Sequence, residues 1–276
     1  MRGYADTDLG QLHYRRSGSG GPAIVLLHES PRTSAVYEPV LDALGAHTTT
    51  IAFDTPGFGQ SDSAPADQPL AEYARILVQG LDALGIDEFV PVGMKTGSSL
   101  ATAMAVSLLG TGRVRRAVLY ALEEPEPAAM EHWAQNWAPE LPVTADGAVL
   151  RYLWDKNVGL YGTDDPRALA GCVADTLGNL ERYNSIYPAV FRGRAKTWAD
   201  NLALVEAGVE LTVLQPPWAR MTLDVPIEFS RMPGTRIVEM PVSGQFPARA
   251  PQEFTAAVLA AVGAPVGASV GASVPA

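Results

Sequence analysis

The chain has 276 residues, a net charge of −10 and a pI near 4.9, which argues against nucleic acid or an anionic membrane as a partner. Its apolar runs are all shorter than the ~20 residues that a membrane span needs. The first ten residues are polar and acidic rather than signal-like, and the lone Cys172 excludes an internal disulfide. We therefore expect a cytoplasmic protein whose partner is a small molecule; its oligomeric state stays open.

Taken in chain order, the periodicity of apolar residues alternates between strand-like and helix-like segments. Strands are predicted at 9–16, 23–28, 48–53, 88–92, 114–122, 211–214 and 236–240, and helices at 34–44, 70–84 and 252–262. The apolar positions of 70–84, such as Tyr73, Ile76 and Leu77, recur at helical spacing. Such alternation predicts an α/β fold with a mostly parallel sheet that is covered on both faces.

Lys95 lies at a predicted sharp turn between a strand and a helix. The pentapeptide at 93–97 reads G-x-K-x-G, and glycines at these positions let a tight turn hold one side chain above a sheet. An ordinary surface lysine at a helix start is the alternative interpretation. The chain holds only three lysines, Lys95, Lys156 and Lys196, so a lysine at this turn favours one that faces a pocket.

Three further motifs agree with this turn. Strand 23–28 runs into Glu29-Ser30-Pro31, strand 50–53 runs into a D-x-P-G-x-G-x-S-D loop at 54–62, and residues 243–247 read S-G-Q-F-P. In type and order these segments resemble the α/β-hydrolase fold superfamily. The resemblance implies a core at 1–122 and 206–262, with a helical cap at 123–205. The low-complexity tail at 263–276 is expected to be flexible.

The resemblance also implies that the catalytic triad is substituted. Lys95 occupies the nucleophile position, and Gln245 occupies the position of the catalytic histidine. The acid is expected near residues 220–222, where there is no carboxylate; the nearest is Asp224. An amide cannot shuttle protons as an imidazole does, so a Ser-His-Asp mechanism is not expected. The backbone N–H groups of Ser30 and Thr96 occupy the oxyanion-hole positions of the superfamily.

The predicted cap holds four of the five tryptophans together with several tyrosines, including Tyr161. Large aromatic residues often simply fill cores, and core packing is expected for about half of them. The others are expected to form an apolar lid over Lys95 that suits a hydrophobic ligand. The expected pocket residues are His28, Met94, Trp133, Trp137, Trp154, Tyr187 and Trp218.

Three roles are open to Lys95: imine formation, proton transfer, or stabilisation of an oxyanion by its charge. Glu29 is the preferred candidate for its counter-ion, ahead of Glu123 and Glu124, and would favour charge stabilisation or proton transfer. No cofactor or metal is expected, because no histidine lies near His28 at ligand-like spacing. The glycine-rich segment 17–21 precedes a strand rather than a helix, unlike a phosphate loop.

Two classes of function follow, with a third behind them. The first is a cofactor-independent enzyme, a lyase, cyclase or isomerase, that acts on a small, largely apolar carbonyl compound. The superfamily places such enzymes in natural-product biosynthesis. The second is a catalytically inactive relative that binds a ligand or a partner. The third is a hydrolase with an atypical constellation, with Ser98 or Ser99 as its nucleophile.

Overall fold

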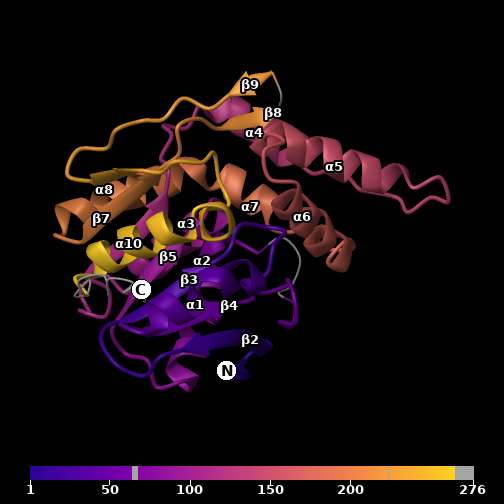
Figure 1. Cartoon of the computed structure of the whole chain (residues 1–276). Coiled ribbons are helices and arrows are strands. Elements are labelled where there is room, and N and C mark those ends of the chain that lie inside the picture. The colour runs from indigo at the N-terminus through magenta and orange to yellow at the C-terminus, as the bar shows by residue number, and fades with distance from the viewer. Residues whose placement is uncertain (64–67, 223, 265–276) are drawn as a thin grey trace, which may run out of the picture.

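The computed structural model describes residues 1–63, 68–222 and 224–264, and confirms the predicted α/β architecture (Figure 1). From residue 265 onward, the predicted flexible tail lies outside the described residues. One eight-stranded sheet has the order β1-β2-β4-β3-β5-β6-β7-β10. Its strands are β1 (Arg2–Thr7), β2 (Gly10–Ser17), β3 (Ala23–Leu27), β4 (Thr49–Phe53), β5 (Phe89–Gly93), β6 (Arg116–Tyr120), β7 (Glu210–Gln215) and β10 (Arg236–Glu239).

The sheet is parallel from β4 to β10, while β1 and β2 pair antiparallel at one edge. The central strands β3, β4 and β5 are almost entirely buried, which explains their continuous apolar sequences. Strand β1 was not predicted from the sequence. Its only buried side chain is Ala5, so this edge strand carries no apolar alternation to recognise.

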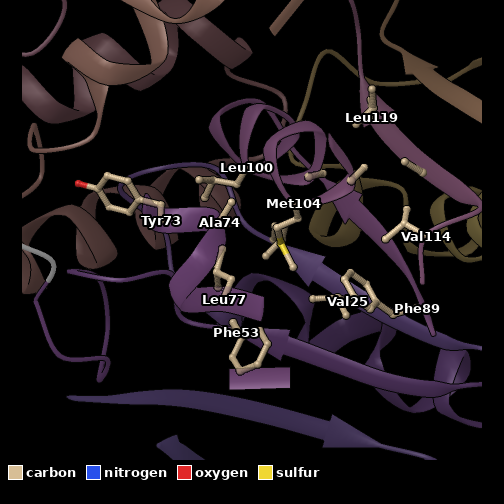
Figure 2. Close-up of a cluster of buried hydrophobic side chains, with 14 of the residues drawn as sticks. Val25, Phe53, Tyr73, Ala74, Leu77, Phe89, Leu100, Met104, Val114 and Leu119 are labelled. Carbon is tan, nitrogen blue, oxygen red and sulfur yellow. The ribbon is translucent and has the colours of Figure 1, made fainter. Parts of the chain in front are cut away.

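Helices cover both faces of the sheet. On one face α2 (Leu70–Ala83), α3 (Thr96–Ser107) and α8 (Arg194–Glu206) pack side by side. The other face carries α1 (Glu38–Gly45), which follows a short 3₁₀ helix η1 (Ser34–Tyr37), together with α9 (Phe246–Arg249) and α10 (Pro251–Val262). Figure 2 shows the core of the first face, where Leu77, Leu100 and Met104 meet Val25 and Phe53 of the sheet.

Four helices between β6 and β7 form the inserted cap, and a hairpin that follows β7 packs against it. They are α4 (Pro127–Asn136), α5 (Ala148–Tyr161), α6 (Pro166–Gly178), α7 (Tyr187–Arg192), β8 (Arg220–Thr222) and β9 (Val225–Pro226). In Figure 1, α4, α5 and α6 lie beyond one end of the sheet, with α4 packed on α7 and α5 on α6. None of the helices in the described ranges combines the length and apolarity that a membrane span requires.

The predicted cap at 123–205 extends too far at its end, because α8 belongs to the layer that covers the sheet. Helix α8 packs against α3 and leads directly into β7. Leu204 is fully buried in the core, and Asn201 Oδ1 accepts a hydrogen bond of 2.9 Å from the Thr102 hydroxyl. The insertion therefore ends near Gly193, before α8, whereas the prediction extended the cap through α8 to residue 205.

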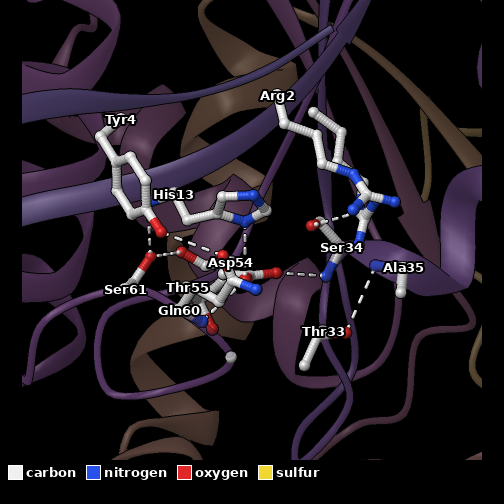
Figure 3. A network of polar contacts seen from close by, with 12 residues as sticks. Arg2, Tyr4, His13, Thr33, Ser34, Ala35, Asp54, Thr55, Gln60 and Ser61 are labelled. Atoms are coloured by element: carbon white, nitrogen blue, oxygen red, sulfur yellow. Dashed lines mark hydrogen bonds and ion pairs between the residues drawn. The ribbon is translucent and has the colours of Figure 1, made fainter.

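The loop at 54–62 is anchored by the buried Asp54 carboxylate, which Figure 3 shows between His13 and Ser34. Asp54 accepts hydrogen bonds from the backbone N–H groups of Ser34 (2.6 Å) and Gln60 (2.9 Å), and lies 2.8 Å from His13 Nδ1. Ser61 closes the network by donating to the Asp54 carbonyl. The most distinctive motif in the sequence thus fixes loops beside the site and does not supply a reacting group.

Candidate active site

Lys95 lies between β5 and α3, with its backbone in the left-handed region at φ 47°. Two glycines make this turn possible. A Cβ on Gly93 would lie 2.3 Å from the Gly97 carbonyl oxygen, and a Cβ on Gly97 would lie 2.1 Å from the Leu27 carbonyl oxygen. Any larger residue at either position would collide with backbone. The glycines therefore bring α3 close to the sheet and present the Lys95 side chain at the start of the helix.

The Lys95 ammonium forms a compact triangle with Tyr161 and Glu29. Lys95 Nζ donates a hydrogen bond of 2.7 Å to the Tyr161 hydroxyl and lies 3.3 Å from Glu29 Oε2. The Tyr161 hydroxyl in turn donates to Glu29 Oε2 at 2.7 Å. The Lys95 side chain is 28% exposed and that of Glu29 only 6%. The predicted counter-ion is thus in contact with Lys95, joined by a tyrosine from the cap.

The charges of this triangle are set by its surroundings. Burial alone would raise the pKa of Glu29, but the positive charges of Lys95 and Arg32 and the Tyr161 hydrogen bond lower it below its ordinary value. Burial and the Glu29 charge raise the pKa of Tyr161. At neutral pH the site therefore holds a carboxylate beside a neutral phenol.

A cavity of about 170 Å³ lies above this triangle, between the sheet and the cap. Lys95, Glu29 and Tyr161 line it, with apolar side chains from α5, α7 and α8. Its aromatic lining consists of Tyr120, Trp137, Tyr161, Tyr183, Tyr187, Phe191, Trp198 and Phe229. Apolar walls with a few convergent polar groups are typical of sites for small organic molecules.

Two of the predicted pocket residues, Trp137 and Tyr187, line this cavity. The prediction is wrong for the other five: His28, Met94, Trp133, Trp154 and Trp218.

The reason differs from residue to residue. His28 is fully buried: its Nε2 accepts the Thr55 N–H at 2.9 Å, so Nδ1 donates to the Glu29 carbonyl at 3.0 Å. Met94 packs into the core on the α1 and α10 face. Trp154 and Trp218 are more than a third exposed.

Trp133 lies behind Trp137 at an edge-to-face angle, with ring centroids 6.1 Å apart. These five side chains are therefore turned away from the cavity by local packing and hydrogen bonds that the sequence pattern does not show.

Gln245, at the position of the expected histidine, does not line the cavity. It is buried, its Nε2 donates to Cys172 Sγ at 2.7 Å, and its Oε1 accepts from Arg32 Nη1 at 3.3 Å. Arg32 is held by Asp175 at 2.5 Å. The Gln245 amide thus connects the loop after β10 to α6. Its position does not support the prediction that Gln245 acts in catalysis.

The oxyanion-hole prediction also needs correction. The Ser30 N–H donates to the Thr96 side-chain oxygen at 2.6 Å, so this amide is already occupied. Tyr187 donates to the Ser30 carbonyl at 2.6 Å and holds the loop in place. The Thr96 N–H is among the first amides of α3, where backbone donors lack helical partners. Of the two expected donors, the Thr96 amide is the one that the geometry leaves for a ligand.

Ser98, one of the alternative nucleophiles, uses its hydroxyl for structure. It donates to the Gly93 carbonyl and accepts the Tyr120 N–H, each at 2.8 Å. Ser99 is buried but also lines the cavity, whereas no histidine of the described chain lines it. Within the described residues no group of three His, Cys, Asp or Glu side chains is placed to hold a metal ion.

Sequence reasoning missed the cavity face of α5. Leu153, Lys156, Asn157, Leu160 and Tyr161 all line the cavity. They follow the i, i+3, i+4, i+7, i+8 spacing of one helical face, the signal that could have identified them.

Comparison with known proteins places these features in context. A family model described as alpha/beta hydrolase fold matches residues 22–152. Haloalkane dehalogenase 2 of Mycobacterium tuberculosis is 33% identical over 115 residues, and 2-hydroxy-6-oxononadienedioate/2-hydroxy-6-oxononatrienedioate hydrolase of Burkholderia vietnamiensis is 37% identical over 102 residues. These alignments cover 41% and 35% of this chain but only 39% and 35% of the relatives.

Solved structures match over almost the whole chain. The enol-lactonase from Burkholderia xenovorans LB400 superposes with a TM-score of 0.68 at 18% identity, covering 95% of this chain and all of the enol-lactonase. The epoxide hydrolase CorEH superposes with a TM-score of 0.69 at 20% identity, covering 95% of this chain and 98% of CorEH. At these identities the similarity establishes the fold and not the reaction.

Proposed function

We propose that the chain, which has the α/β-hydrolase fold and carries a lysine at the turn between β5 and α3, is a cofactor-independent enzyme with non-hydrolytic chemistry. The substrate is a small, largely apolar carbonyl compound, and the reaction is a lyase, cyclase or isomerase step. The superfamily resemblance alone suggests a place in natural-product biosynthesis. The observation that carries the proposal is the triangle of Lys95, Tyr161 and Glu29 at the floor of the cavity.

Lys95 acts on the carbonyl oxygen of the substrate. Its ammonium lies in a largely apolar cavity, 3.3 Å from the Glu29 carboxylate. As an enolate or oxyanion forms, negative charge develops on the carbonyl oxygen, and a fixed cation in a water-poor site stabilises that charge strongly. The Thr96 N–H supplies a second donor from the start of α3.

Tyr161 gives the same triangle a second state. If the ammonium passes a proton to the phenol oxygen while the phenol gives its own proton to Glu29, Lys95 becomes a neutral amine and Glu29 a carboxylic acid. The neutral amine can then take a proton from the carbon next to the carbonyl. The lowered pKa of Glu29 makes the charged state the resting one, so we rank charge stabilisation and proton transfer above imine formation.

Deuterium exchange tests this proposal without the natural substrate. A simple ketone, 7-oxo-7-phenylheptanoate, is incubated with the protein in D2O, and mass spectrometry follows deuterium uptake at the carbon next to the ketone. We expect uptake above the buffer rate, abolished in Lys95→Met and partly retained in Lys95→Arg if charge alone matters. Wild-type uptake by a folded Lys95→Met variant would remove Lys95 from the chemistry. A borohydride-trapped adduct on Lys95 would instead establish the imine.

The second candidate function is a ligand-binding protein without catalysis. It is favoured by the occupied Ser30 amide and by the ion pair that already satisfies Lys95. The same experiment separates the two, since probe binding without any deuterium uptake above buffer supports binding alone.

A hydrolase with an atypical constellation ranks third, although the relatives above carry hydrolase names. Ser98 has both of its hydroxyl interactions within the fold, and none of the described residues that line the cavity is a histidine. Activated aryl esters should therefore be cleaved no faster than by the Lys95→Ala variant. Ester cleavage that is independent of Lys95 and blocked by a serine-directed phosphonate would establish the hydrolase instead.

A further inference from the structure

The cavity has the opposite charge to the rest of the protein. Among the described residues, five cationic side chains line it, Arg32, Lys95, Lys156, Arg194 and Arg220, against the two carboxylates Glu29 and Glu123. The chain as a whole carries a net charge of −10. A positive cavity inside an acidic protein attracts an anion while the outer surface repels it.

Most of these cations already have partners. Glu29 lies beside Lys95, Glu123 beside Arg194, and Asp175 beside Arg32. Within the described part of the chain, Lys156 and Arg220 have no carboxylate within 4.0 Å.

Arg220 is exposed and stacks over Trp218 at 4.9 Å, so water can solvate its charge. Lys156 is only partly accessible to water, and it is the cavity cation whose charge the described structure leaves unbalanced.

The contacts of Lys156 leave room for a ligand. Its Nζ donates a hydrogen bond of 2.6 Å to the Trp137 carbonyl and lies 4.4 Å from the centroid of the Trp137 ring. An ammonium has three donors, and one carbonyl uses one of them. Burial lowers the pKa of Lys156 to about 8, as expected for a cation without a counter-charge.

Helix α5 sets the spacing between the backbone positions of Lys156 and Tyr161 along the cavity. Lys156 and Tyr161 are on the same cavity-lining face, and Tyr161 holds Lys95. Five residues of helix separate the two, a rise of roughly 7–8 Å along the axis. Between them the face is made by Asn157 and Leu160. A ligand that lies along this face touches Lys95 at one end and Lys156 at the other.

We propose that Lys156 binds a carboxylate of the substrate, so that the substrate is an apolar carbonyl compound with a carboxylate about six carbon–carbon bonds from the reacting carbonyl. The position of the reacting carbonyl rests on the proposed function of Lys95. A single ammonium above an aromatic ring suits a carboxylate better than a phosphate, which the forked donors of arginine recognise. Lys156 thereby determines specificity and orients the carbonyl toward Lys95.

A matched pair of probes tests this assignment. The dissociation constants of 7-oxo-7-phenylheptanoate and of its uncharged primary amide are measured by calorimetry with the full chain. Lys156→Met removes the cation at similar length, and Lys196→Met is the matched control, because Lys196 is paired with Asp200 outside the cavity. We expect the acid to bind about tenfold more tightly than the amide, and this preference to vanish in Lys156→Met alone.

Several results would overturn the assignment. These are equal affinities for acid and amide, absence of acid binding at millimolar concentration, an equal loss of both ligands in Lys156→Met, or a borohydride-trapped adduct on Lys156. The proposed function fails separately: a Lys156-dependent preference without deuterium exchange leaves the carboxylate site standing and removes the chemistry. Deuterium exchange that depends on Lys95, without tighter binding of the acid than of the amide, supports the chemistry and removes the carboxylate site.

Discussion

The Tyr161 hydroxyl donates a hydrogen bond of 2.7 Å to the Glu29 carboxylate, across 132 positions of the chain. Tyr161 is the last residue of cap helix α5, and Glu29 follows strand β3 of the sheet. The ionic environment of Lys95 is therefore complete only while the cap is seated on the core. This dependence leads to predictions that separate the cap from the turn beneath it.

Tyr161→Phe removes the hydroxyl between Lys95 and Glu29 and retains the ring. We expect deuterium exchange to fall by about 10- to 100-fold, because the proton path is cut, while affinity for the amide probe stays unchanged. Tyr152→Phe is the matched control on the same helix, since Tyr152 is 37% exposed and does not line the cavity. Unchanged exchange in Tyr161→Phe would contradict a role for the phenol.

Glu29→Gln should slow exchange, because the carboxylate that lies 3.3 Å from Lys95 Nζ and accepts the Tyr161 hydroxyl is replaced by a neutral amide. We expect a loss of about 10-fold or more at pH 7. In the wild type the lowered pKa of Glu29 keeps its carboxylate charged as pH falls to the ordinary glutamate value, so exchange should persist there. Glu124→Gln, an exposed neighbour of the cap hinge, should exchange at the wild-type rate. An unchanged rate in Glu29→Gln would show that the Glu29 carboxylate has no part in the reaction.

Asp54→Asn should destabilise the fold rather than change the chemistry. Burial would raise the pKa of Asp54, but its hydrogen bonds from Gln60 and Ser34 lower it. A lowered pKa stabilises the folded state above the pH at which the unfolded carboxyl titrates, and this stabilisation is lost as pH falls through the folded pKa. We expect a loss of about 2–4 kcal/mol at pH 7, measured by urea unfolding, that shrinks below about pH 4.

The matched control is Asp62→Asn, whose exposed carboxylate accepts one hydrogen bond from Gln11. The free energy of unfolding of Asp62→Asn should fall by less than half of the loss expected for Asp54→Asn. Equal losses in the two variants would show that the buried network of Figure 3 contributes nothing particular.

Lys156→Met should stabilise the protein at neutral pH. Burial lowers the pKa of Lys156 from 10.5 to about 8, so between these values the unfolded chain binds more protons and wild-type stability rises with pH. The gain in Lys156→Met should therefore be present at pH 7 and shrink by pH 10, as urea midpoints would report. Lys196→Met should show no such pH dependence. A constant difference at both pH values would mean that Lys156 is not desolvated.

The sheet and the turn at Lys95 could be predicted because each depends on residues that are close together in the sequence. Buried parallel strands require continuous apolar sequence, and the turn at Lys95 requires Gly93 and Gly97. The partnership of Lys95 with Glu29 followed from two turns at the carboxyl ends of adjacent strands, β3 and β5. These features depend on sequence neighbours or on sheet topology, and both can be predicted from the pattern of apolar residues and glycines.

The rest depends on contacts that patterns do not record. The aromatic residues of the cap are all plausible pocket residues in the sequence, and the packing angle of α5 selects Tyr161 while turning Trp154 outward. His28 follows a site strand, yet its imidazole is taken by Thr55 from the next loop. The amide of Ser30 is occupied by a side chain 66 positions away, Thr96.

The backbone of Lys95, at φ 47° and ψ −109°, has a thermodynamic consequence. A residue other than glycine in such a conformation costs about 1–3 kcal/mol, so glycine would make the folded state more stable there. A glycine at this position would relieve that cost and would also remove the ammonium that lines the cavity. At this turn, folding stability and the presence of an amine therefore oppose each other.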